Sequence, residues 1–287
     1  MRRHWLAREI RVLRREYERS SADLARGVGF PRRHISMLEN AQRGPDIDLV
    51  VAICDHLQVG SRRREEIISA AVDGWTVGWW DTDAAAMGHR QARYADLESG
   101  TAAISEYALA LVPGLLQIPE FVAARTRSDP ARLPSDLDPA AVVAARARRQ
   151  ELLLASDGPR YEVILDELAV RRRAAEPAIM AAQLRHIVTV GESHPAVTVR
   201  VLPIDATIKS QSAPRSAYSI YRYSDKYPTI AVAVDTLTTD LILVERRETE
   251  PYRELHSRLK SAALPPGPSI ELLTDAAQFL DPVQGKT

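Results

Sequence analysis

Two short helices joined by a glycine turn are predicted by residues 20–39, SSADLARGVGFPRRHISMLE, and this stretch constrains the fold more than any other. Ser20 is a favourable helix N-cap, and Asp23 three residues later gives an approximate capping box. Gly29 can take a positive φ without steric cost, so it suits the turn. Pro31 suits the first position of the following helix, where its missing N–H needs no partner.

The second of these helices has two chemically different faces. By helical periodicity, Ile35 and Leu38 share one face and a polar set with two arginines lies opposite. An arginine can donate two hydrogen bonds to a guanine base edge, so an exposed helix that begins with arginines is suited to reading the DNA major groove. The expected DNA-contacting residues are Ser21, Arg32, Arg33, His34, Ser36, Met37, Asn40 and Arg43.

Further helical patterns flank this pair. Before it, one helical stripe contains Leu6, Ile10, Leu13 and Tyr17. After it, Asp46 can cap a helix with an apolar face formed by Ile47, Val50, Val51, Cys54 and Leu57. A fifth helix is expected from Ser61 to about Val72. Residues 1–72 therefore predict a bundle of five helices with its own core.

This bundle resembles the Cro/repressor-like, xenobiotic-response-element family of helix-turn-helix domains. The resemblance is carried by Ser20, Leu24-Ala25, Gly29, Ile35-Ser36 and Leu38-Glu39. It implies binding to a double-stranded DNA operator as a homodimer. The chain departs from the family at Ser21, where Gln is usual, and at Asn40-Ala41, where a basic residue and Gly are usual. The alternative is a helical bundle without a role on DNA.

The distribution of charge is consistent with a DNA-binding N-terminal end. The chain has 38 basic and 38 acidic residues, yet residues 1–45 hold eleven Arg and five acidic residues, a net charge of +6. A local basic excess on a neutral chain is the expected electrostatic footprint of a nucleic-acid-binding end. The high share of Arg among the basic residues also fits a GC-rich genome, so the segregation of charge is the stronger argument.

The length of 287 residues suggests two domains. The single cysteine excludes an internal disulfide. We find no apolar signal core at the N-terminus, and the apolar run at 108–118 is too short to span a bilayer, so a cytoplasmic protein without membrane contact is expected. Residues 73–89 mark the boundary and hold Trp75, Trp79 and Trp80, which fits either a docked hinge or an exposed patch for a partner.

Residues 90–287 alternate between helical and strand patterns, which predicts an α+β domain with a mixed or antiparallel sheet. Strands are expected at 161–165, 196–202, 217–223 and 229–234, and the apolar segment 101–108 is expected to be extended. Helices are expected at 91–97, 119–126, 139–155, 166–173, 177–190, 245–262 and 269–279.

This second half resembles the C-terminal domain of the actinobacterial WhiJ-like transcriptional regulators. The matching residues are the VPGLLQ segment at 112–117, Pro119-Glu120-Phe121, Arg149-Gln150, Asp166-Glu167, Gln183-Leu184 and Val201-Leu202-Pro203. The family's C-terminal domain has no assigned chemistry. The resemblance implies pairing with a small protein encoded nearby, in an antitoxin-like or developmental arrangement.

The VPGLLQ segment is the most specific part of this match. Pro113-Gly114 predicts a tight turn with a positive φ at the glycine. Gln117 is either a group that satisfies the turn or a ligand contact. Asp166-Glu167 are either catalytic carboxylates or, more in keeping with the pattern, a helix cap and a favourable first-turn charge. The residues predicted to bind a partner or ligand are Trp79, Trp80, Pro113, Gly114, Leu115, Leu116 and Gln117.

The sequence contains none of the common catalytic or phosphate-binding motifs, and its seven histidines lack the spacing of metal ligands. We therefore expect a protein that is not an enzyme and that has no cofactor and no metal. Three hypotheses follow for the whole chain. The first is a DNA-binding regulator whose C-terminal domain binds a partner or pairs subunits. The second makes that domain a small-molecule receptor, and the third is an enzyme fused to a DNA-binding module.

Overall fold

The computed structural model of the chain describes residues 2–41, 44–74, 78–128, 138–211, 213–223, 230–236 and 240–281. These residues divide into two compact units, one within residues 1–79 and the other from residue 80 onward. The exact limits of the predicted domains stay predictions.

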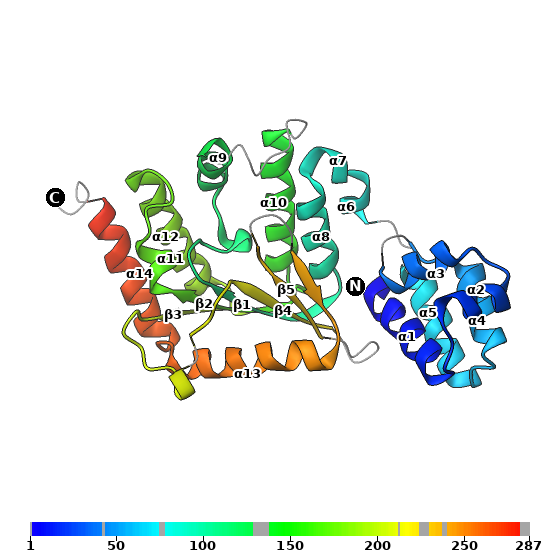
Figure 1. The fold of residues 1–287 in the computed structure, drawn as a ribbon. Helices are drawn as coiled ribbons and strands as arrows, with labels where there is room; N and C mark the ends of the chain where they lie inside the picture. Colours follow the sequence, from blue (N-terminus) through cyan, green and yellow to red (C-terminus); the bar gives the residue numbers. More distant parts are fainter. Residues whose placement is uncertain are drawn as a thin grey trace. The chain divides into compact units, whose positions relative to one another are not determined.

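The N-terminal unit contains the five predicted helices. They are α1 (Arg2–Glu16), α2 (Ser21–Val28), α3 (Arg32–Glu39), α4 (Ile47–His56) and α5 (Ser61–Gly74) (Figure 1). One hydrophobic cluster joins all five, with Leu6, Leu24 and Ile35 fully buried in it. The prediction of a helical bundle with its own core is therefore confirmed.

Local signals explain where these helices begin and end. The Ser20 hydroxyl accepts a hydrogen bond from the Asp23 amide at 3.1 Å, and Asp23 accepts one from the Ser20 amide at 3.3 Å, so the capping box is complete. Gly29 ends α2 in the left-handed conformation, with φ 72°. The Asp46 carboxylate caps α4 by accepting the Leu49 amide at 3.2 Å.

Two details of the predicted bundle are wrong. Pro31 is the N-cap residue of α3 and not its first helical residue, since its ψ of 137° is extended. Tyr17 lies beyond the end of α1 and is 43% exposed, so it does not continue the buried stripe. Arg14, four residues after Ile10, takes the next place on that side of the helix.

The single cysteine is part of the N-terminal core. Cys54 is fully buried on α4, and burial raises the pKa of its thiol to about 11. Because the thiolate is the reactive form, this thiol is inert at neutral pH.

The C-terminal unit has the predicted α+β fold with a mixed sheet. Its strands are β1 (Thr101–Ala108), β2 (Arg160–Asp166), β3 (Val197–Leu202), β4 (Tyr218–Tyr223), β5 (Ile230–Val234) and β6 (Leu241–Leu243). Its longer helices are α8 (His89–Glu98), α9 (Pro119–Ser128), α10 (Pro139–Leu154), α12 (Pro177–Ser193), α13 (Arg246–Ala262) and α14 (Pro266–Leu280). The short helices are α6 (Trp79–Thr82), α7 (Ala84–Met87) and α11 (Glu167–Arg171), with 3-10 turns at Gly114–Leu116 and Lys209–Gln211.

The six strands form one sheet in the order β3-β2-β1-β4-β5-β6. Strands β1, β2 and β3 are parallel, whereas β4, β5 and β6 join in antiparallel pairs. The parallel part needs crossovers, which α10 and α12 supply between the paired strands. The sequence did not predict β6, which has only three residues.

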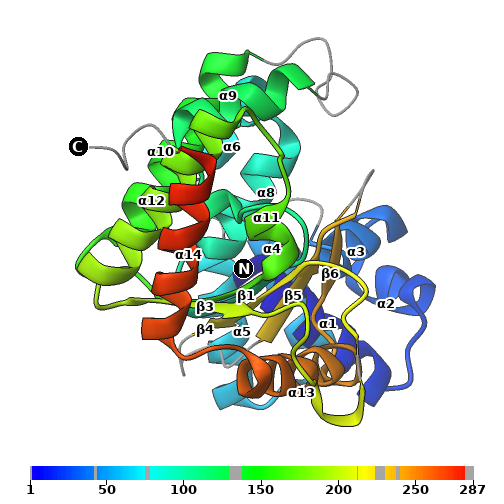
Figure 2. The same cartoon turned by 90° about the vertical axis from the view of Figure 1, so that its left-hand side faces the viewer.

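Helices cover both faces of this sheet (Figure 1). Helix α13 packs on one face over a cluster that includes Tyr107, Tyr218 and Leu259. Helices α8 and α10 lie on the opposite face, and α12 and α14 run side by side near β3 (Figure 2). Adjacent residues of β2 show the alternation, because Glu162 binds Lys260 of α13 at 2.6 Å whereas the Tyr161 hydroxyl binds Glu106 on the other face at 2.7 Å.

Polar groups are unusually concentrated between the sheet and α8 and α10. Arg149 is 6% exposed and forms a two-pronged ion pair with Glu98, at 2.8 and 2.5 Å. Burial raises the pKa of the nearby Glu106 to about 7, the charge of Glu98 adds to this effect, and the Tyr161 hydroxyl and Arg149 oppose it. Glu106 therefore releases its proton near neutral pH.

We predict that Glu106→Gln removes part of the pH dependence of stability. The folded chain holds the Glu106 proton up to about pH 7, whereas the unfolded chain releases it near 4.5, so folding stability falls as the pH rises through this window. The variant keeps an acceptor for Tyr161 and carries no charge. At pH 8 its free energy of unfolding should exceed that of the parent by about 1–3 kcal/mol, since one pKa unit corresponds to about 1.4 kcal/mol.

Urea unfolding followed by circular dichroism at pH 5, 6, 7 and 8 measures this difference. Glu151→Gln, at an exposed position of α10, is the control and should leave the pH profile unchanged. An identical slope between pH 5 and 7 for the parent and Glu106→Gln would contradict the prediction.

Candidate functional site

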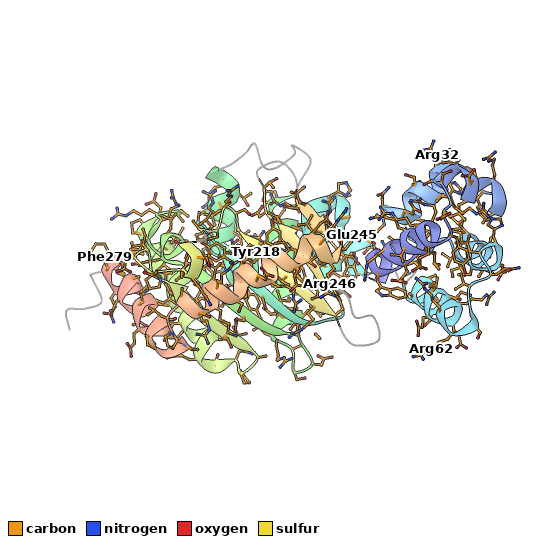
Figure 3. All side chains as sticks on the ribbon, turned by 60° about the horizontal axis from the view of Figure 1, so that its bottom comes forward. Arg32, Arg62, Tyr218, Glu245, Arg246 and Phe279 are labelled. Atoms are coloured by element: carbon orange, nitrogen blue, oxygen red, sulfur yellow. The ribbon has the colours of Figure 1, made fainter. Side chains whose placement is uncertain are left out.

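Helix α3 presents the predicted DNA-contacting face to solvent. Arg32, Arg33 and Ser36 are exposed, and the side chain of Arg32 projects away from the bundle in Figure 3. Ile35 and Leu38 of the same helix are buried in the core. The predicted division of α3 into an inner and an outer face is confirmed for these residues.

The remaining predicted contact residues lie around this face. His34 and Met37 are partly buried, and Ser21 is partly buried in the first turn of α2. Asn40 is exposed, but its side-chain amide donates to the Ser36 carbonyl at 2.7 Å. Asn40 thus closes the last turn of its own helix. Arg43 lies outside the described residues.

Two arginines stand in the first turn of α3 without an acidic neighbour in that turn. The N-terminal end of a helix carries a partial positive charge, so arginines there raise the local potential further. Neither Arg32 nor Arg33 forms an ion pair within the described part of the chain. By contrast, Arg26 of α2 is bound to Asp23. The outer start of α3 therefore carries two positive charges that no acidic side chain of the described residues offsets.

A buried ion pair fixes α3 against α1. Glu39 is 6% exposed, and Arg14 binds both of its carboxylate oxygens, with Nε–Oε1 2.5 Å and Nη2–Oε2 3.0 Å. These hydrogen bonds raise the pKa of Arg14. Arg11 also donates to the Glu39 backbone carbonyl at 2.5 Å. Two arginines of the basic N-terminal segment thus hold the helix in place.

Sequence reasoning missed the roles of Arg11 and Arg14, because it counted them only as part of the basic excess. One signal was available for Arg14. It lies four residues after buried Ile10, so it continues the inner side of α1. Its partner Glu39 is 25 residues away, and no local pattern connects the two.

The residue after Asn40 is in a strained conformation. Ala41 has φ 52°, in the left-handed region that residues with a Cβ enter at a cost. This is the position at which the sequence departs from the glycine usual in similar helix-turn-helix domains. Ala41 therefore holds a left-handed conformation that glycine would adopt without this cost.

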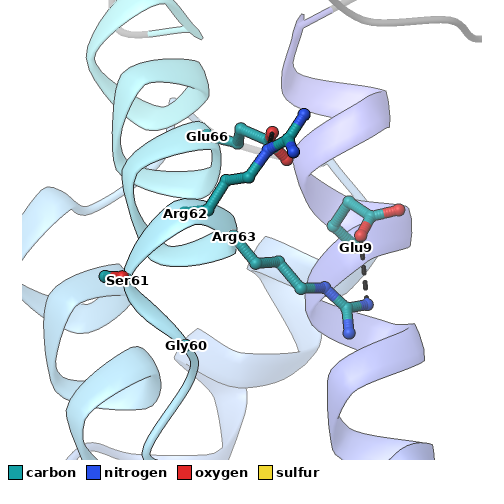
Figure 4. A pocket seen from close by; sticks show the side chains of 6 residues that line it. All are labelled: Glu9, Gly60, Ser61, Arg62, Arg63 and Glu66. Atoms are coloured by element: carbon teal, nitrogen blue, oxygen red, sulfur yellow. Dashed lines mark hydrogen bonds and ion pairs between the residues drawn. The ribbon is translucent and has the colours of Figure 1, made fainter.

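A hollow in the N-terminal unit lies between α1 and the start of α5 (Figure 4). It is lined by Glu9, Gly60, Ser61, Arg62, Arg63 and Glu66. Arg63 pairs with Glu9 at 3.3 Å, and Arg62 pairs with Glu66 at 3.4 Å. Its charged groups satisfy one another, so we assign no ligand to it.

In the C-terminal unit, the VPGLLQ segment forms a 3-10 turn rather than the predicted turn with a left-handed glycine. The Leu116 amide donates to the Pro113 carbonyl at 3.0 Å, and Gly114 is not among the residues with positive φ. The turn still drives Leu115 and Leu116 inward, to 5% and 1% exposure. The predicted conformation of Gly114 is wrong, and the predicted burial of the two leucines is confirmed.

Three glutamines clamp this segment through its backbone. Gln117 donates to the Val112 carbonyl at 2.6 Å, which confirms its predicted role in satisfying the turn. Gln150 of α10 donates to the Gln117 carbonyl at 2.7 Å. Gln183 of α12 is fully buried, donates to the Leu116 carbonyl at 2.6 Å and accepts the Ile118 amide at 2.9 Å. Motif residues far apart in the sequence therefore meet at one turn.

Other sequence-predicted residues have structural roles. Asp166 caps α11 by accepting the Leu168 amide at 2.9 Å, as predicted. Glu167 lies in the first turn of α11 and pairs with Arg171 at 2.7 Å. Trp79 and Trp80 are partly buried in α6, and Trp75 lies outside the described residues.

The described residues contain no group of three or more His, Cys, Asp or Glu arranged to hold a metal ion. Across the same ranges, no helix combines the length and the apolar character that crossing a membrane requires.

Comparisons with known proteins assign both regions. Residues 5–67 match a family model described as a helix-turn-helix domain. Residues 91–275, more than half of the chain, match the model described as Domain of unknown function (DUF5753). No curated protein and no solved structure matches the chain significantly.

We predict that Ala41→Gly stabilises the N-terminal unit. A left-handed residue with a Cβ costs about 1–2 kcal/mol, while glycine adds about 0.4–1 kcal/mol of entropy to the unfolded chain. The free energy of unfolding should therefore rise by about 0.5–1 kcal/mol. Ala52→Gly, within α4, should lower it by a similar amount. Chemical denaturation of both variants tests the opposite signs, and a loss of stability in Ala41→Gly would contradict the argument.

Proposed function

The chain belongs to the family described as Domain of unknown function (DUF5753), and we propose on this premise that it is a sequence-specific DNA-binding transcription regulator. The helix-turn-helix match covers 5–67, and within it the outer face of α3 is the observation that carries the proposal. Arg32 and Arg33 are exposed there, without ion pairs among the described residues, at the positive end of a helix whose other side is fixed by Glu39.

The proposed mechanism places α3 in the major groove. Arg32 and Arg33 have the reach and donor geometry for guanine edges or flanking phosphates. The Arg14–Glu39 ion pair fixes the orientation of α3 relative to α1, so it acts as a positioning contact. Ser36 and Met37 lie one turn further along and would meet the following bases.

We further propose the finer class that the sequence motifs indicate. This is a Cro/repressor-like, xenobiotic-response-element domain in a WhiJ-like regulator that binds its operator as a homodimer. One recognition helix reads only a few base pairs, and a dimer doubles that information on half-sites about 34–36 Å apart. The C-terminal unit would pair subunits or bind a small protein encoded nearby, in an antitoxin-like or developmental setting.

The same proposal treats the chain as a binding protein and not as an enzyme. Support comes from the sequence, which lacks the common nucleophile, phosphate-loop and metal-ligand motifs. In the C-terminal unit, Asp166 and Glu167 are engaged in capping and in an ion pair, which favours a structural role for both.

We predict that Arg32→Ala and Arg33→Ala weaken specific DNA binding without unfolding the protein. Both side chains are exposed, so their removal leaves the core intact. A base-reading arginine should cost about 1–3 kcal/mol of binding free energy, roughly 5- to 150-fold in affinity. An arginine that contacts only phosphate should instead reduce the salt slope by about 1. Arg62→Ala, at an exposed position of α5, is the matched control.

Binding isotherms on the native operator at several salt concentrations separate the two cases. Circular dichroism of each variant verifies that it is folded. Parent-like affinity and an unchanged salt slope in both α3 variants would refute the placement of this helix in the groove.

We also predict how the two units divide the work. Residues 1–79 contain a complete core and should fold alone, and should bind the operator more weakly than the whole chain because they lack the pairing unit. Fusion of this piece to an unrelated dimeriser should restore most of the affinity. Residues 80–287 should not bind the operator. If residues 1–79 alone bind as tightly as the whole chain, the C-terminal unit does not support DNA binding.

A further inference from the structure

Arg146 and Arg149 are one turn apart on α10, and their surroundings differ sharply. Arg149 is fully satisfied by its neighbours. It donates to both oxygens of the Glu98 carboxylate and to the side-chain oxygen of Gln91, and its guanidinium carbon lies 5.5 Å from the centre of the Tyr94 ring. Its charge is thus balanced by a carboxylate inside the protein.

Arg146 has no such counter-charge. Its one hydrogen bond in the described part of the chain runs from Nη1 to the Gln117 side-chain oxygen, and its buried Nε has no acceptor. Gln117 is neutral, so it does not balance the guanidinium. The carboxylate whose charge acts on Arg146 is that of Glu98, and it is held by Arg149.

The other charges around Arg146 add to the imbalance. Arg149 and Arg90 both act on it as like charges. Arg90 is itself bound to Asp235 and Asp240, so those carboxylates are engaged elsewhere. Burial, and to a smaller extent repulsion from the charge of Arg149, lower the pKa of Arg146 to about 9. A withdrawn charge without a counter-ion is costly, and proteins normally pair it.

The donors of Arg146 that have no acceptor are grouped on one side of its guanidinium. One Nη1 N–H is directed to Gln117, and the Nε–H and one Nη2–H lie along a single edge of the guanidinium without an acceptor among the described residues. This edge matches the two oxygens of a carboxylate or a phosphate. The VPGLLQ turn contributes a residue without a side chain beside the guanidinium, because a Cβ on Gly114 would lie 3.8 Å from Arg146 Cζ.

We propose that the Nε–Nη2 edge of Arg146 is the recognition point for the oxyanion of a small molecule, a carboxylate or a phosphate group, bound beside the VPGLLQ turn. Gln117 orients the guanidinium for this contact, and Gln150 fixes the turn that carries Gln117. Gln91 adds a second buried donor without an acceptor to the same network, because its Oε1 is bound to Arg149 while its Nε2 is free of partners.

The test is thermal unfolding of the full-length protein in sodium phosphate, sodium acetate and sodium chloride at equal ionic strength and pH 7. Binding to the folded state alone raises the midpoint, so phosphate or acetate should raise that of the parent by about 2–4 °C over chloride. The larger rise identifies the preferred class of oxyanion. Arg148→Gln, two residues away and exposed on the same helix, should respond like the parent.

Arg146→Gln should lose the response to both anions. Since it removes an unbalanced charge, its midpoint in chloride should equal or exceed that of the parent. Arg146→Lys is the second variant, because it keeps the charge but has no two-donor edge, and it should lose most of the response. The proposal is overturned if neither anion raises the parent's midpoint above chloride, or if the rise is the same in the two Arg146 variants.

The inference does not depend on the proposed role in DNA binding. Oxyanion binding is measured on the protein without an operator, so the two proposals can fail separately. If both hold, operator affinity measured in phosphate and in chloride at equal ionic strength reports whether the site is coupled to DNA binding.

Discussion

The ion pair between Arg14 and Glu39 determines where the exposed face of α3 lies. A carboxylate that is 6% exposed is tolerable only with a partner that binds both oxygens, and Arg14 does so. Removal of either partner would leave a buried charge, at a cost of about 3–5 kcal/mol. The contact thus couples the stability of the bundle to the orientation of α3, and this orientation sets the direction in which Arg32 and Arg33 project.

Much of this fold could be predicted from local patterns. The helix caps at Ser20 and Asp46 and the glycine turn are encoded by residues within one or two helical turns of each other. The limits of most strands follow from local runs of β-branched and aromatic residues. The errors have physical causes. Tyr17 fits the stripe of α1, but the helix ends before it, and Gly114 permits a positive φ that the 3-10 turn does not need. The strand β6 has three residues, too few to give a pattern.

The candidate sites could be predicted only in part, because their decisive contacts are long-range. The exposure of Arg32 and Arg33 follows from helical periodicity, whereas the Arg14–Glu39 pair spans 25 residues. The VPGLLQ segment was recognised as specific, but its clamp uses Gln150 and Gln183, which are 33 and 67 residues from the atoms they bind. No local period encodes such distances. A sequence motif therefore identifies residues with a specific role, but it does not show which of them are in contact in the folded chain.

Burial alone does not give a residue its role, as the two arginines of α10 show. Arg149 is buried between α8, α10 and the sheet, and Arg146 is half-buried one turn away beside the VPGLLQ turn, with its Nε inaccessible to water. Arg149 has a carboxylate on two of its donors, so it stabilises the fold and has nothing left to offer a ligand. Arg146 donates one hydrogen bond to a neutral amide and keeps an edge without acceptors. Its partly buried charge is therefore not balanced by a carboxylate and lowers the stability of the fold. A bound anion would neutralise this charge and accept its hydrogen bonds. Arg146 is therefore the residue of this unit that we expect to bind a ligand.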